Sequence, residues 1–162
     1  MKEDKTSLEK LKEKYKEIKK KHGLPSFEDL NKDFGIEKIA EYETDFLIRE
    51  VRKYIGERSS NYLRFLETIL NPVNAPMFVF SFIKLIGSDE KKRLTEIYKE
   101  LIKEEIKVLE LDMEFSEEKE AKFIREYFVF WQKIKKEMLE LLVKVNGNWD
   151  NKSEGNSKGY FG

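Results

Sequence analysis

The residue types that most often carry out chemistry in proteins are scarce in this chain of 162 residues. It has no cysteine, which excludes disulfides, thiolate nucleophiles, zinc fingers and iron–sulfur clusters. Its one histidine, His22, cannot supply the paired motifs of di-iron bundles or zinc proteases. His22 stands just before Gly23, where we expect a helix to end and its dipole to favour a positive charge. We interpret His22 as structural and predict no catalytic residue.

Carboxylates are abundant, and the densest run contains Glu114, Glu117, Glu118 and Glu120. Magnesium and calcium sites use such groups, but with a glycine turn or the interleaved spacing of an EF-hand, and neither occurs here. Acidic residues are also common in the first turn of a helix, where they complement the dipole. We interpret the run as a solvated helix start and predict no metal site. No phosphate-binding or dinucleotide-binding glycine motif is present, so no cofactor is predicted.

The first 22 residues hold the main basic patch, with nine lysines against five acids. A phosphate-binding helix would present its lysines on one face, yet Glu9, Glu13 and Glu17 lie among them. The first arginine is Arg49, and arginine is the residue most used for bidentate phosphate and base contacts. We favour a solvated helix surface and keep nucleic-acid or ribosome association through this lysine-rich helix as an alternative function.

The overall composition describes an all-α protein with an ionic surface. Charged residues make up 40% of the chain, with 32 basic against 32 acidic, so no global field favours nucleic acid or a membrane. The first residues are charged, which predicts no signal peptide and a cytoplasmic protein. The preference for Lys and Glu, with a single Gln, is a composition associated with thermophiles.

Residues 75–86 are the part of the chain around which we expect the fold to form. Eight of the ten residues from Met77 to Ile86 are apolar and point in every direction of a helical wheel. Such a helix is normally surrounded by neighbours, so we predict a short central helix buried on all sides. A membrane span needs about 20 apolar residues, and polar and charged residues interrupt any longer window here. We therefore predict no transmembrane segment.

Apolar residues at spacings of three and four predict the longer helices around this centre. The pattern over 36–70 keeps one phase across Gly56, which favours one long helix but leaves a break there open. From 88 a helix with one broad apolar face is expected, containing Leu94, Ile97, Tyr98, Leu101, Ile102, Ile106 and Leu109. The prediction is a single-domain bundle of about six helices over 1–145, beginning with an amphipathic helix at 6–22, and a flexible polar tail at 146–162.

The function favoured by these patterns is a non-catalytic protein–protein interaction or assembly role, with a protein partner or a homo-oligomer. The first helix has a narrow apolar seam, and two aromatic residues of the last helix fall off its main stripe. Further aromatic residues stand alone in the polar tail. The candidate interface residues are Leu8, Leu11, Tyr15, Ile18, Phe123, Phe130, Trp149, Tyr160 and Phe161. A small-molecule-binding protein or an enzyme with a pocket near the central helix is a further alternative.

Overall fold

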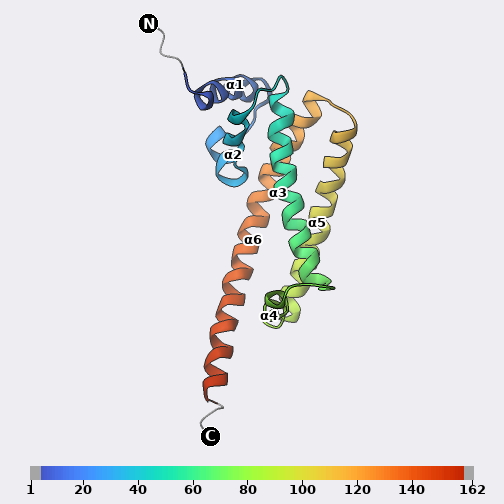
Figure 1. Cartoon of the computed structure of the whole chain (residues 1–162). Coiled ribbons are helices and arrows are strands. Elements are labelled where there is room, and N and C mark those ends of the chain that lie inside the picture. Colours follow the sequence, from blue (N-terminus) through green and yellow to red (C-terminus); the bar gives the residue numbers. More distant parts are fainter. Residues whose placement is uncertain (1–4, 159–162) are drawn as a thin grey trace. The chain divides into compact units, whose positions relative to one another are not determined.

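The fold is an all-α helical bundle, as predicted. The computed structural model describes residues 5–158, with 152–158 described as helical backbone only. No strand occurs in this range, which contains six α-helices and one 3-10 helix, η1 (Figure 1). The elements are α1 (Ser7–His22), α2 (Phe27–Phe34), η1 (Ile36–Glu41), α3 (Leu47–Leu70), α4 (Met77–Ile83), α5 (Ser88–Met113) and α6 (Glu117–Lys158).

Local capping signals start and end the first two helices, and the first of them agrees with the predicted helix at 6–22. The Thr6 hydroxyl accepts a hydrogen bond from the Glu9 amide at 3.3 Å, and the Glu9 carboxylate accepts one from the Thr6 amide at 2.8 Å. Ser26 caps α2 through its side chain. Gly23 and Gly35 follow the two helices in the left-handed conformation, with φ of 64° and 65°. Glycine adopts this conformation without steric cost, so it ends a helix readily.

Residues 36–70 form two helices, and the break lies at 42–46. Helix α3 passes through Gly56 without interruption. A Cβ atom at Gly56 would stand 3.3 Å from a methyl group of Val108 on α5. The glycine therefore permits close packing of the two helices, which explains why a residue that weakens helices is tolerated inside α3.

The chain forms two compact units. Among the described residues, unit 1 comprises 5–61 with Lys103–Phe130, and unit 2 comprises Tyr62–Ile102 with 131–158. Helices α3, α5 and α6 each contribute residues to both units. A single folded domain over 1–145 stays a prediction.

The core of unit 1 joins the short N-terminal helices to the start of α6. The Tyr15 hydroxyl donates a hydrogen bond of 2.6 Å to the carbonyl of Pro25, and its ring meets the Phe27 ring edge-on at 5.5 Å. The Phe34 ring meets the Tyr127 ring at 6.1 Å. Tyr15 and Tyr127 are almost fully buried, so aromatic contacts fix α1 and α2 within this unit.

Unit 2 packs α4 and the first half of α5 against the second half of α6. The rings of Tyr62 and Trp131 lie 4.8 Å apart. An ion pair of 2.7 Å joins Glu90 of α5 to Lys144 of α6. The Asn148 amide donates a hydrogen bond of 3.0 Å to the carbonyl of Leu85, which ties α6 to the segment after α4.

The prediction of a fully buried central helix is wrong. Helix α4 is shorter than the predicted 75–86. Only one side of it is covered in unit 2: Val79 is 4% exposed, while Met77 is 83% and Phe78 is 68% exposed. A helix with apolar residues on every side is not necessarily packed against other helices on every side. Here the second side of α4 is left open among the described residues.

Helix α6 continues beyond the predicted end of the bundle at Val145. It runs to Lys158, through a stretch whose Gly, Asn and Ser content predicted a tail. The bond from Asn148 to Leu85 holds the first turn after Val145. Flexibility of this region stays a prediction. In the part of the chain that the structure describes, no helix has the length and apolar character needed to cross a bilayer.

Candidate protein-interaction surface

Helix α5 carries two apolar stripes within unit 1. Val108 and Leu111 belong to the inner stripe and are 7% and 6% exposed. Ile106, Leu109 and Met113 are spaced by three and four residues and are 52%, 55% and 89% exposed. At about 100° per residue, the two sets lie on nearly opposite sides of the helix. We call Ile106, Leu109 and Met113 the outer α5 stripe.

This arrangement corrects the prediction of one broad apolar face on α5. Leu101 is buried as expected, but Ile106 and Leu109 lie on the exposed side. The sequence pattern does not decide which set of residues after Leu101 is buried. Apolar residues occur both at Ile106 and Leu109 and at Val108 and Leu111. The inner stripe continues instead through Val108 and Leu111.

An exposed aromatic pair lies just beyond the outer stripe along the chain. Phe46 and Phe115 are 57% and 41% exposed, and their rings meet edge-on at 5.3 Å. The Arg49 guanidinium lies 5.7 Å from the centroid of the Phe115 ring, a cation–π distance. These contacts hold the connection after α5 in place and leave both rings partly exposed.

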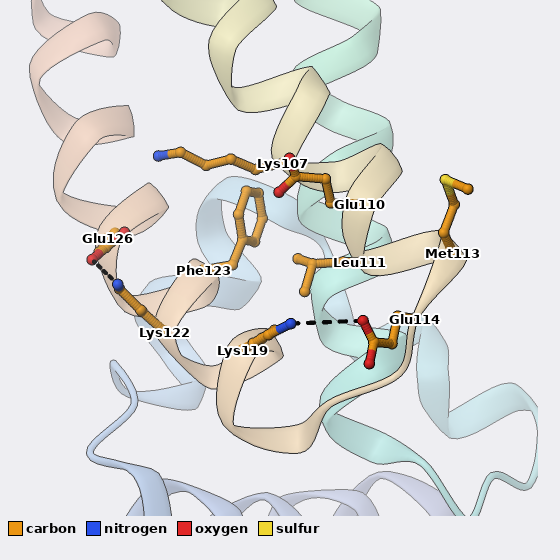
Figure 2. A pocket seen from close by; sticks show the side chains of 9 residues that line it. All are labelled: Lys107, Glu110, Leu111, Met113, Glu114, Lys119, Lys122, Phe123 and Glu126. Carbon is orange, nitrogen blue, oxygen red and sulfur yellow. Dashed lines mark ion pairs between the residues drawn. The ribbon is translucent and has the colours of Figure 1, made fainter.

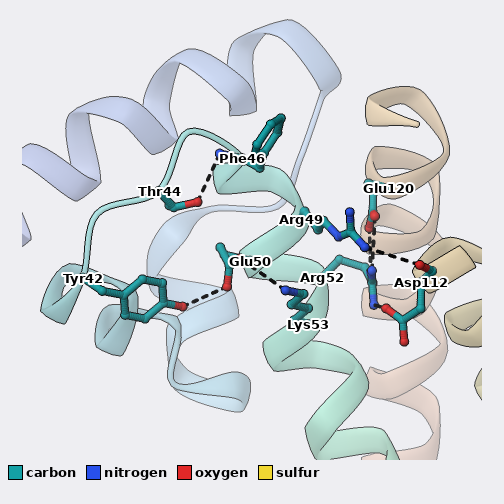
Figure 3. Close-up of polar contacts among 9 residues, drawn as sticks. All are labelled: Tyr42, Thr44, Phe46, Arg49, Glu50, Arg52, Lys53, Asp112 and Glu120. Atoms are coloured by element: carbon teal, nitrogen blue, oxygen red, sulfur yellow. Dashed lines mark hydrogen bonds and ion pairs between the residues drawn. The ribbon is translucent and has the colours of Figure 1, made fainter. Parts of the chain in front are cut away.

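A buried ion-pair network fixes the end of α5 (Figure 3). Arg52 of α3 is 1% exposed and donates hydrogen bonds of 2.6 Å and 3.3 Å to the two carboxylate oxygens of Glu120, which is fully buried. A third bond, of 2.7 Å, joins Arg52 to Asp112. Burial opposes the charge on Arg52, but the hydrogen bonds to Glu120 and Asp112 outweigh it, so the Arg52 pKa is raised. The network joins three helices.

Sequence reasoning missed this network. The sequence pattern places Glu120 in a solvated acidic run and predicts no role for Arg52. One signal was present: Arg52 shares the apolar face of α3 with Ile48 and Ile55, which lie four residues before it and three after it. A charged residue on a buried face needs an opposite charge, so Arg52 predicts a buried acid without naming it.

A groove of about 450 Å³ lies at the connection between α5 and α6 (Figure 2). Leu111, Met113 and Phe123 form its apolar part, so the groove shares Met113 with the outer α5 stripe. Its charged residues are Lys107, Lys119, Lys122, Glu110, Glu114 and Glu126. Lys119 pairs with Glu114 and Lys122 with Glu126, each at 3.8 Å. Because the charges balance, the groove does not select a charged ligand.

The N-terminal seam is an internal packing surface. Leu11 and Tyr15 are 6% and 1% exposed, and Leu8 and Ile18 are half-buried. Tyr15 packs on Phe27 of α2 within the same unit. The seam therefore faces its own chain and is not open to another one.

The two off-stripe aromatics of α6 also pack within unit 1. Phe123 is 4% exposed, and its ring stacks on Tyr127 at 5.4 Å. Phe130 is half-buried and meets Tyr127 edge-on, also at 5.4 Å. Both contacts are with Tyr127 of the same helix, and because Phe123 is buried and Phe130 half-buried, the two do not form an exposed patch.

Of the aromatic residues predicted in the tail, the structure describes only Trp149. It is 52% exposed on α6. Tyr160 and Phe161 lie outside the described residues.

His22 lies at the end of α1, where its contacts are with α6. Its Nε2 atom is 2.8 Å from the Glu117 carboxylate, and Arg125 donates a hydrogen bond of 2.6 Å to the His22 carbonyl. Hydrogen bonds from His22 and Lys21 lower the pKa of Glu117. These contacts agree with a structural role. Among residues 5–151, whose side chains the structure describes, no group of three or more His, Cys, Asp or Glu side chains could hold a metal ion.

The structure offers little support for the two alternative functions, which are a ligand pocket near α4 and nucleic-acid binding through α1. A cavity beside α4, lined in part by Phe82, measures about 10 Å³, which is room for no more than one water molecule. On α1, Glu9, Glu13 and Glu17 are exposed at intervals of four residues and form an acidic row along the helix. This row separates the lysines, so α1 does not present a continuous basic face.

Comparison of the chain with protein-family models, with curated proteins and with solved structures finds no significant match.

Proposed function

We propose that this chain is a non-catalytic interaction protein that binds an amphipathic helix of a partner protein along the outer α5 stripe. The observation that carries this proposal is the exposure of Ile106, Leu109 and Met113 on a helix whose opposite side is buried. Large apolar residues repeated along one helix face are the usual anchors for a partner helix. The role is that of an adaptor or assembly factor.

The surface is held rigidly before binding. Asp112 lies one residue before Met113 and is bonded to the buried Arg52. Phe115 follows Met113 and packs against Phe46. A surface that is already ordered loses less conformational entropy on association, which favours affinity. Burying an exposed Leu, Ile or Met side chain is worth about 1.5–3 kcal/mol before the cost of association is subtracted.

The charges beside the stripe indicate the chemistry of the partner. Within residues 105–113 of α5, at about 100° per residue, Glu105 and Glu110 are the charged residues closest to the two edges of the stripe, and Lys103 lies one turn before Ile106. A second copy of the chain would bring the same acidic borders, which repel one another. A partner helix whose apolar face is bordered by Lys or Arg fits better.

Binding to a purified partner tests the proposal. The full chain is immobilised, proteins retained from a native lysate are identified and purified, and their affinity is measured by calorimetry. Leu109→Asp places a charge in the stripe and should weaken binding at least tenfold. Val129→Asp is the matched control, because Val129 is 71% exposed on α6 in the same unit. This variant should bind like the wild type.

Two results would overturn the proposal. One is a partner that binds Leu109→Asp as tightly as it binds Val129→Asp. The other is a dimer of the chain alone, seen by light scattering and abolished by Leu109→Asp, because the stripe would then serve a second copy.

A further inference from the structure

A second exposed apolar surface lies in unit 2, on a segment without charge. Residues 71–83 contain no charged side chain, although 40% of the chain is charged. Within this segment Val73, Met77 and Phe78 are 72%, 83% and 68% exposed, and Phe80 is 41% exposed. We call Val73, Met77, Phe78 and Phe80 the α4 surface.

The α4 surface stands on a fixed base. On the covered side of α4, Val79 is 4% exposed and the Phe82 ring lies 6.3 Å from the Phe65 ring. The cavity beside these rings measures only about 10 Å³, so the packing there is tight. The exposed side chains therefore project from an anchored helix.

We propose that the α4 surface inserts into the interfacial region of a membrane that contains anionic lipids. Inserting a segment in lipid requires that no charge be dehydrated and that backbone groups be bonded internally. Residues 71–83 carry no charge, and the main chain of α4 is helical. Protein-binding surfaces normally have a polar rim with charged residues, which this segment does not supply.

The charges that follow α4 complement an anionic surface. The three exposed lysines are Lys84, Lys91 and Lys92. The two acids of the same stretch are Asp89 and Glu90, and Glu90 is paired with Lys144 at 2.7 Å. Lysines beside an inserted apolar segment attract anionic headgroups. Anionic lipid should therefore bind more strongly than neutral lipid.

Co-sedimentation of the full chain with vesicles tests the proposal. One set of vesicles is phosphatidylcholine alone, and the other contains about 30% phosphatidylserine. We expect about tenfold more bound protein with phosphatidylserine, and less at high salt. The double substitution Met77→Ser with Phe78→Ser should lower this binding at least fivefold. Val129→Ser, which removes an equally exposed apolar residue in unit 1, should leave it unchanged.

Three results would overturn the inference. The first is a wild-type chain that does not sediment with either kind of vesicle. The second is a double variant that circular dichroism shows to be folded but that sediments like the wild type. The third is a protein partner whose binding is lost in the Met77→Ser, Phe78→Ser variant. Leu109→Asp should leave vesicle binding intact. Failure of the membrane contact is therefore distinguishable from failure of the α5 interaction.

Discussion

At the scale of single residues, the buried pair of Arg52 and Glu120 is the contact most sensitive to substitution. Both side chains are removed from water, and each satisfies the charge of the other. Glu120→Ala would leave the Arg52 charge buried with Asp112 alone. We expect the free energy of unfolding to fall by about 3–5 kcal/mol, as for other broken buried pairs. Urea denaturation followed by circular dichroism measures the change.

The control for this prediction removes both charges. Arg52→Met with Glu120→Leu leaves no buried ion and should recover most of the lost stability. A loss of less than 1 kcal/mol for Glu120→Ala alone would show that water reaches the pair and that α6 is not clamped there.

The ion pair between Glu90 and Lys144 predicts a pH dependence. The hydrogen bond from Lys144 lowers the pKa of Glu90 below its ordinary value of 4.5. A lowered folded-state pKa gives stability that is present above pH 4.5 and is lost as the pH falls through the folded-state pKa. Glu90→Gln should therefore flatten the acidic limb of a plot of unfolding free energy against pH. If the unfolding free energies of the wild type and of Glu90→Gln fell in parallel below pH 4.5, the ion pair of Glu90 with Lys144 would not contribute to stability.

Contacts between residues a few positions apart, such as helix caps, can be predicted from the sequence. Contacts between residues far apart in the sequence cannot. Thr6 and Ser26 cap helices through neighbours three residues away, so their roles follow from local spacing. Arg52 and Glu120 are 68 residues apart in sequence, and no local pattern pairs them. Arg52 could be flagged on its apolar helix face, but its partner required the fold.

At the scale of helices, the contact of α3 with α5 at Gly56 gives a graded prediction. Gly56→Ala gains about 1 kcal/mol of helix propensity, but its Cβ would meet a Val108 methyl at 3.3 Å. The two effects should nearly cancel, leaving thermal stability close to that of the wild type. Gly56→Leu should lower the unfolding free energy by about 1–3 kcal/mol through overpacking. An unchanged Gly56→Leu variant would show that α5 does not pack closely there.

Periodicity located the helices but did not decide which apolar side each one buries. Helix α5 has apolar residues on both sides, and sequence alone assigned Ile106 and Leu109 to the core. Helix α4 is apolar on every side, and its exposed half depends on how many neighbours the fold supplies. In α6, the helix continues past Val145, and Asn148 there bonds to Leu85, a contact that composition does not indicate.

At the scale of the whole chain, the protein is helical and highly charged, and its exposed apolar residues include the outer α5 stripe and the α4 surface. With 32 basic and 32 acidic residues, the chain has no net charge to steer partners. We propose that recognition comes from local surfaces, namely the outer α5 stripe in unit 1 and the α4 surface in unit 2. Each has its own anchored base, so each can be tested separately.

The most direct test of the central claim compares two adjacent residues of α5 by thiol labelling. The chain has no cysteine, so Val108→Cys and Leu109→Cys each introduce a single thiol. Val108 is 7% and Leu109 is 55% exposed. At submicromolar concentration, we predict that Leu109→Cys labels about 100-fold or more faster, because a buried thiol reacts only after local unfolding. Equal protection of both positions would contradict the claim that the outer α5 stripe is open to a partner.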